Sequence, residues 1–333
     1  MIETFRRVLR RLGSVETTSV LIVLCAVIAL LGIFLPIRTS NWMVLPFALL
    51  MANLLAALAT NARLKSQSML FAFHAALVAV IVLVGLDRLH AMHGRVEVAE
   101  GSMFDASAVA AEHGLLHDLR LGEVRFLQGP FEITYAPGMK RRETESVIRI
   151  PEQNGGWREV RVGDPTPLIF GDYRFYTTHN KGFAPIVTYV SASGDSRTGA
   201  IHMPSYPMNE NKQGLAWTPP GATKPLKVWL HIPEPVFDEA KAWKFVKPTN
   251  TRLVLIDGDE RHELSVGEVV SLGSAQLRYD GLRSWMGYTI VGQSMIHWIA
   301  AASLMACLAL LGHVLSVLIY GSRIPAAGAE HGG

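Results

Sequence analysis

The sequence predicts a membrane α-helical protein with four transmembrane helices and a β-rich, sandwich-like extracytoplasmic domain. Half of the 333 residues are hydrophobic and only 18% are charged, a composition that does not suit an ordinary soluble enzyme. Four long apolar runs occur in the chain, and one uninterrupted polar block separates the third run from the fourth. Short alternating segments and turns fill that block, as in β-rich domains.

The apolar runs predict the membrane-spanning elements. Residues 17–36 are uncharged and about long enough to cross a bilayer, although a signal peptide is the alternative interpretation of this run. The predicted organisation is three transmembrane helices in residues 1–90 (about 17–36, 42–59 and 68–86), then a domain in residues 91–292, then a fourth helix (about 295–320) and a short tail in residues 293–333.

Basic residues predict the orientation of these helices. Four arginines within residues 6–11 precede the first run, and Arg63 and Lys65 lie between the second and third runs. Lys and Arg are enriched on the cytoplasmic side of membrane proteins. Both termini are therefore predicted to be cytoplasmic, and the large domain to be exported.

The polar block is expected to fold without cross-links. Its residues 94–290 carry a formal charge of −2, and the rest of the chain carries +5, which gives no reason to expect nucleic acid as a partner. The cysteines, Cys25 and Cys307, both lie in apolar runs, so the block has no disulfide, no Cys-type zinc site and no C-x-x-C-H haem-attachment site. It also lacks the common catalytic motifs, so nothing identifies an enzyme.

Alternating segments predict the strands of the block. Residues 106–121 are predicted as a helix, although Gly114 weakens that pattern. The expected strand segments are residues 95–98, 132–135, 146–150, 159–162, 173–176, 186–190, 227–231 and 253–256.

Two histidines inside apolar runs are the first candidate functional residues, because ionisable side chains in a membrane are costly. His74 lies about 9 Å into the third span from its cytoplasmic end, and His313 about 10 Å from the cytoplasmic end of the fourth. Equal depth suits a pair of axial imidazoles on one non-covalent haem b iron. Asn53 has a similar depth and is expected to hydrogen-bond an imidazole or a haem propionate. A stripe of small residues is expected to turn His313 toward protein: Ala302, Ala306, Ala309, His313 and Ser316.

A second cluster of candidate haem-binding residues is expected near the outer membrane face, where His90 and His93 follow the third span and His297 begins the fourth. The two histidines of each helix, 16 residues apart, lie about 160° apart around its axis, so straight helices do not aim both inward. The alternative for both clusters is bonding within the bundle or at the headgroups. His113 and His117 are either metal ligands on one helix face or surface residues. The other histidines of the block are isolated in sequence: His179, His202, His231 and His262.

The layout resembles the ResB family of cytochrome c biogenesis proteins over most of the chain. The resemblance lies in LGSVETTSVLIVL, LLGIFLP, SNWMVLPFALLMANLLAALATNAR and FAFHAALVAVIVLVG of the first three spans, and in GRVEVAEGSMF, FEITYAPG, ESVIRI and VGDPTPLIFGDYRFYTTH of the block. Before the fourth span, where the family has an Asp-Pro-Gly-like run, this chain has Gly292, Gln293 and Ser294.

The resemblance implies a non-catalytic subunit of the system II pathway in the bacterial inner membrane, with its large domain in the periplasm. In that pathway haem crosses the membrane and is joined to exported apocytochrome c. The resemblance gives the haem-ligand role to His74 and implies a CcsA-like membrane partner. Two other functions stay open: a b-type haem protein that passes electrons from quinol to an exported cytochrome, and a scaffold without haem.

Overall fold

The computed structural model describes residues 2–34, 44–118, 120–207, 212–233, 238 and 240–321. These residues form two compact units. The helical unit contains residues up to 91, residues 113–117 and residues from 293 onward. The β unit contains residues 92–112 and 118–292.

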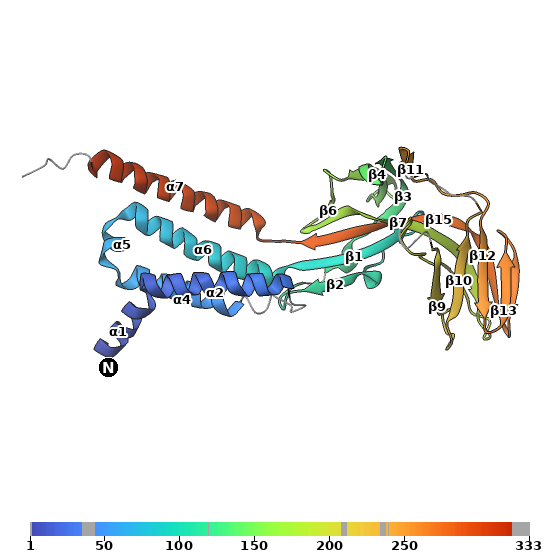
Figure 1. Cartoon of the computed structure of the whole chain (residues 1–333), viewed down its shortest axis with the longest axis horizontal. Coiled ribbons are helices and arrows are strands. Elements are labelled where there is room, and N and C mark those ends of the chain that lie inside the picture. The colour runs from blue at the N-terminus through green and yellow to red at the C-terminus, as the bar shows by residue number, and fades with distance from the viewer. Residues whose placement is uncertain are drawn as a thin grey trace, which may run out of the picture. The chain divides into compact units, whose positions relative to one another are not determined.

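The helical unit contains the four apolar runs as helices (Figure 1). Two of them, Ser68–His90 and Ile296–Ile319, are long and apolar enough to cross a membrane, and a bent pair, Glu3–Leu12 with Val15–Leu31, passes the same test as one span. The apolar helix Leu45–Thr60 is shorter than this test requires. The prediction of four transmembrane helices is therefore not confirmed, although the apolar helices indicate a membrane protein. The helices are α1 (Ile2–Leu12), α2 (Val15–Phe34), α4 (Val44–Thr60), α5 (Ala62–Ser66), α6 (Ser68–His90) and α7 (Ile296–Gly321).

Packing between these helices buries small side chains and leaves large ones exposed. Helix α6 packs along α7, and α4 packs against α1, α2 and α6. Ala56 and Ala76 are buried in these contacts, as are Ala302, Ala306 and Ala309 of the predicted stripe on α7. Many leucines and valines of α2 and α7 are exposed, as expected for helices surrounded by lipid.

The β unit consists of antiparallel sheets, which confirms the predicted β-rich domain (Figure 1). Among the described residues, the largest sheet has the order β2-β1-β15-β7-β6, with β14 added to β15 and β8 to β7; two four-stranded sheets have the orders β13-β12-β10-β9 and β11-β3-β4-β5. The strands are β1 (Met92–Ala99), β2 (Ala110–His113), β3 (Leu127–Ala136), β4 (Lys140–Pro151), β5 (Trp157–Gly163), β6 (Leu168–Phe170), β7 (Tyr173–Val190), β8 (Ser196–Ala200), β9 (Gly214–Trp217), β10 (Leu226–His231), β11 (Trp243–Lys244), β12 (Arg252–Asp257), β13 (Glu260–Leu264), β14 (Val269–Leu272) and β15 (Ala275–Gly292).

Two 18-residue strands, β7 and β15, pair along nearly their whole length. Two register shifts interrupt the pairing, between Tyr279 and Gly281 and between Met286 and Tyr288 of β15. Bulges of this kind bend a long strand pair. Aromatic side chains of both strands enter the core. There Phe175 of β7 and Phe126, the residue before β3, are fully buried, with their ring centroids 5.6 Å apart.

The predicted helix over residues 106–121 is wrong. This stretch contains a 3₁₀ turn (Ala106–Ala108), strand β2, and the first residues of a second 3₁₀ turn (Arg120–Glu123). Backbone hydrogen bonds to the end of α6 replace those of a helix, since the amides of Gly114 and Leu116 donate to the carbonyls of Ala91 and Leu89. Contacts with α6 therefore override the local helical pattern.

Candidate functional site

His74, the histidine in the first half of α6, has one ring nitrogen bound and the other available. His74 is half-buried, its Nδ1 lies 2.8 Å from the carbonyl oxygen of Leu70, and its ring packs edge-on against Phe73. A carbonyl only accepts, so Nδ1 carries the proton and Nε2 of the neutral ring keeps its lone pair. Histidines that bind metals usually hold their second nitrogen in this way. His74 therefore fits one axial position of a haem iron.

Contacts at both ends of the α6–α7 pair fix how the two helices are aligned. A Cβ atom at Gly312 of α7 would lie 3.3 Å from Sδ of Met69 on α6. At the other end, the amide of Met295 lies 3.4 Å from Oδ1 of Asp87. Both contacts give the same antiparallel register, in which His313 lies level with the first residue of α6.

This register separates the two histidines expected at equal depth. His313 is half-buried on α7, about six residues or 9 Å further along the helix pair than His74. The sequence estimate fails because α7 continues beyond the level at which α6 begins, so counting from the helix end overestimates the depth of His313. In this register the predicted equal depth of the two histidines is wrong, whereas their binding to one iron stays a prediction.

Asn53 is bound to the backbone instead of an imidazole. It is the most deeply buried polar residue of the described helices, 1% exposed. Its Nδ2 donates to the carbonyl of Leu12 and, at 3.4 Å, to that of Ser14, and its Oδ1 accepts from the hydroxyl of Thr18 at 2.9 Å. The side-chain amide of Asn53 on α4 therefore holds α4 against the junction of α1 and α2.

At the other end of α6, the structure brings together histidines that are distant in sequence. His117 Nδ1 lies 2.6 Å from the carbonyl of His90, and the rings of His117 and His113 have centroids 5.9 Å apart. The expected cluster members His93 and His297 are exposed. Among the described residues, no three His, Cys, Asp or Glu side chains are placed to hold a metal ion. This group therefore acts as a cap on the end of α6.

The β unit contains a buried polar network that sequence reasoning missed. The Tyr288 hydroxyl lies 2.7 Å from Oε1 of Gln128 and 2.9 Å from Oγ of Ser146, and Gln128 Nε2 donates to the same Oγ at 2.8 Å. Burial raises the pKa of Tyr288 above its ordinary value, and the two hydrogen bonds oppose this. The network joins β15 to β3 and β4, strands of another sheet.

A buried lysine was also missed. Lys181 is 3% exposed, and its Nζ lies 4.6 Å from the ring centroid of Tyr135. Burial, with a smaller contribution from Arg141, lowers the pKa of Lys181 to about 8, and burial raises the pKa of Tyr135 to about 12. The alternation of polar and apolar residues in the sequence does not show that the Lys181 side chain points into the core.

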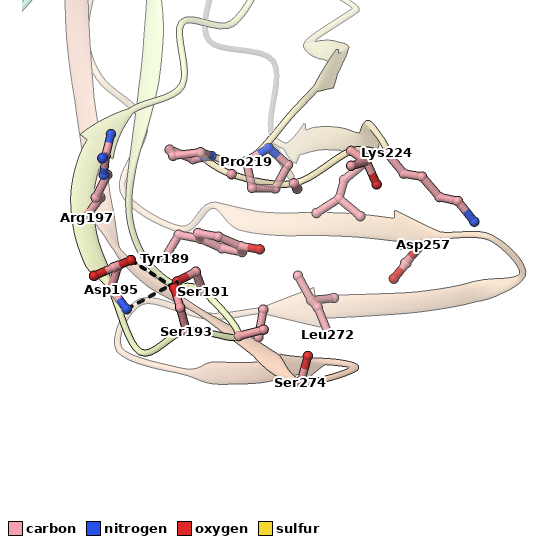
Figure 2. A pocket seen from close by; sticks show the side chains of 17 residues that line it. Tyr189, Ser191, Ser193, Asp195, Arg197, Pro219, Lys224, Asp257, Leu272 and Ser274 are labelled. Atoms are coloured by element: carbon pink, nitrogen blue, oxygen red, sulfur yellow. Dashed lines mark hydrogen bonds between the residues drawn. The ribbon is translucent and has the colours of Figure 1, made fainter.

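Two surface hollows of the β unit are lined by polar residues. One hollow contains His179 and His202. Nδ1 of His202 lies 3.5 Å from Oε2 of Glu97. Figure 2 shows the other, between the loop from Pro219 to Lys224 and the turn of Ser191 and Asp195. The charged side chains of this second hollow are all exposed. Its residues therefore do not indicate a particular class of ligand.

The comparisons with known proteins identify a family. No curated protein shows significant similarity to the chain. The family model of the ResB-like family matches residues 58–324, which include α6, the β unit and α7. Because this match covers most of the protein, the chain belongs to the ResB-like family.

Proposed function

We propose that this protein acts in cytochrome c biogenesis by holding haem during its passage across the membrane and presenting it to an exported apocytochrome c. Family membership implies the biogenesis role. Haem is the cargo of this process rather than a resident cofactor. The observation that carries the haem-handling step is the geometry of His74 at its depth in an apolar helix. His90 makes the same contact with the Leu86 carbonyl but is the last residue of α6.

His74 suits transient binding of haem. It lies in an apolar helix, and its Nδ1–H is held by the Leu70 carbonyl, which orients the ring and leaves Nε2 for the iron. A single protein ligand leaves the opposite axial position for a group from another molecule. We place that group on a CcsA-like partner, because α6 and α7 pack directly against each other and leave no layer between them for a haem bound by both His74 and His313.

The β unit is the proposed docking surface for the apocytochrome. It has no cysteine, so it offers no thiol for exchange with those of an apocytochrome. With a charge near neutrality, it steers partners weakly, and we expect shape and a few anchor residues to determine affinity. In the proposed orientation both termini are in the cytoplasm of a bacterium, and the β unit lies on the outer face of the inner membrane.

The second candidate function is a membrane b-type haem protein that passes electrons between quinol and an exported cytochrome. Such a carrier holds its haem permanently, most simply between two imidazoles of its own chain. The direct packing of α6 on α7 leaves no layer for such a haem between His74 and His313, which favours the biogenesis function.

Deletion of the gene tests the proposal against the alternative. We expect exported c-type cytochromes to lose covalent haem staining, and the wild-type gene on a plasmid to restore it, whereas a His74→Ala gene should not. A His313→Ala gene is the matched control and should restore staining. Normal staining in the deletion strain, with impaired electron transfer to the same cytochromes, would refute the biogenesis function.

A further inference from the structure

Helix α1 has one charged face and one apolar face. Successive helical residues are about 100° apart around the axis, which puts Arg6, Arg7, Arg10 and Arg11 within an arc of about 140°. Phe5, Val8, Leu9 and Leu12 occupy an arc of about 100° on the other side. The two arcs do not overlap, so α1 is strongly amphipathic.

The described residues cover only part of the apolar face of α1. Leu9 and Leu12 are half-buried on the side that packs toward α4, whereas Phe5 is 66% and Val8 59% exposed. The four arginines are exposed and form no ion pair with a described carboxylate. Helix α1 therefore offers an apolar strip beside four unpaired cations.

A fixed bend separates α1 from the spanning helix that follows. The axes of Glu3–Leu12 and Val15–Leu31 differ by 48°, and the break occurs at Gly13 and Ser14, a residue pair typical of helix kinks. A Cβ atom at Gly13 would lie 2.6 Å from the backbone nitrogen of Ala57 on α4. Ser14 caps α2 by accepting from the amide of Thr17 at 3.2 Å.

Buried Asn53 fastens this bend, as its amide binds the carbonyl groups of Leu12 and Ser14 on either side of the break. A polar group buried to this extent without partners would be costly, so the bend and the position of Asn53 stabilise each other. The direction of α1 is therefore built into the fold.

We infer that α1 is a surface-binding helix that lies among anionic phospholipid headgroups, with Phe5 and Val8 in the acyl boundary and its arginines on the phosphates. Helices of this composition bind the membrane interface through apolar burial together with attraction to anionic lipid. Each Arg near an anionic surface strengthens binding about fivefold. The inference depends on the membrane character of the protein and not on its haem-handling role.

The test uses the full chain with Cys25→Ala and Cys307→Ala, carrying one nitroxide at Val8→Cys or, on the charged face, at Glu3→Cys. The protein is reconstituted into vesicles of phosphatidylcholine alone or mixed with phosphatidylglycerol. Collision with oxygen reports lipid exposure of the label, and collision with a nickel chelate reports water exposure. In the mixed vesicles we expect the label at position 8 to be protected from nickel and the label at position 3 to be accessible.

Protection at position 8 should fall in phosphatidylcholine alone, at high salt, and in the Arg6→Gln/Arg10→Gln variant. The matched control, Arg63→Gln/Lys65→Gln, should keep it. The salt and lipid arms need no arginine variant, so they test the inference even if that variant does not fold. The inference would be overturned if the label at position 8 were equally accessible to nickel in both vesicle types. It would also be overturned if the label were equally protected in both vesicle types and at both low and high salt.

Discussion

Gly312 of α7 lies against Met69 of α6, and this contact sets the alignment of the two helices that carry His74 and His313. A larger residue at Gly312 would press on the Met69 thioether, since even a Cβ atom would be 3.3 Å from Sδ. The pairing of Met295 with Asp87 at the opposite end agrees with the same register. Whether two histidines reach one iron is therefore decided by helix packing and not by their distance from the helix ends.

Cysteine cross-linking checks this register. In the Cys25→Ala/Cys307→Ala background, we expect Met69→Cys with Gly312→Cys to form a disulfide in membranes, because a Cβ atom at position 312 would lie 3.6 Å from Cγ of Met69. His74→Cys with His313→Cys is the control pair and should not cross-link, because disulfides need Cα atoms within about 7 Å. Efficient cross-linking of the control pair would show that the helices are aligned differently.

The cap on the end of α6 requires glycine at position 114. A Cβ atom there would lie 2.2 Å from the Leu89 carbonyl oxygen, so Gly114→Ala should displace residues 113–117. We expect faster amide hydrogen exchange in residues 113–117, whose amides at Gly114 and Leu116 bind the end of α6. Gly122→Ala is the matched control, because a Cβ atom meets nothing there. Unchanged exchange in Gly114→Ala would contradict this close contact.

The Tyr288 network should stabilise the β unit. Tyr288→Phe removes the hydroxyl that both Gln128 and Ser146 contact, and leaving buried polar groups with fewer partners costs about 1–3 kcal/mol. We expect a lower apparent Tm for the detergent-purified chain by circular dichroism. Tyr176→Phe, at a half-buried position, should change Tm little. Equal Tm values for the two variants would show that the network contributes nothing.

Lys181 should make stability depend on pH above neutrality. Its pKa is about 8 in the fold and about 10.4 in an unfolded chain, so the unfolded state binds more protons between these values. Stability contributed by this group therefore rises with pH across that window, by up to about 3 kcal/mol. We expect Lys181→Met to raise Tm at pH 7 and to flatten the rise between pH 8 and pH 10.4.

The control for this variant is Lys227→Met, at an exposed position of β10. It should keep the wild-type dependence of Tm on pH. A Lys181→Met chain that is less stable at pH 7 would mean that the contact with the Tyr135 ring outweighs the cost of burying the charge.

Much of the fold was predictable because it depends on local patterns. All eight alternating segments lie in strands; for example, residues 227–231 lie in β10 and residues 253–256 in β12. The apolar runs form helices where the structure describes them. Helix α2 (Val15–Phe34) begins two residues before the predicted 17–36, and residues 35 and 36 lie outside the described part of the chain. Period and hydrophobicity are sufficient for these elements.

The parts that failed depend on contacts between distant residues. Within residues 106–121, strand β2 pairs with β1, and residues 113–117 bind the end of α6. Gly114 was the sequence signal against a helix here. The depth of His313 depends on the contact of Gly312 with Met69. Asn53 was noticed as a polar residue at depth, but its partners are two backbone carbonyls and the Thr18 hydroxyl at a bend that no motif predicts.

The spin state of bound haem shows whether His74 is its single axial ligand from this chain. We expect the detergent-purified chain, supplied with haem, to bind it in a high-spin form that added imidazole converts to a low-spin form, because one axial position is open. Haem content should fall about tenfold or more in His74→Ala and stay unchanged in His313→Ala. The opposite result is a wild-type chain that binds haem in a low-spin form without added imidazole and loses this form in both variants. That result would mean that His74 and His313 bind the same iron.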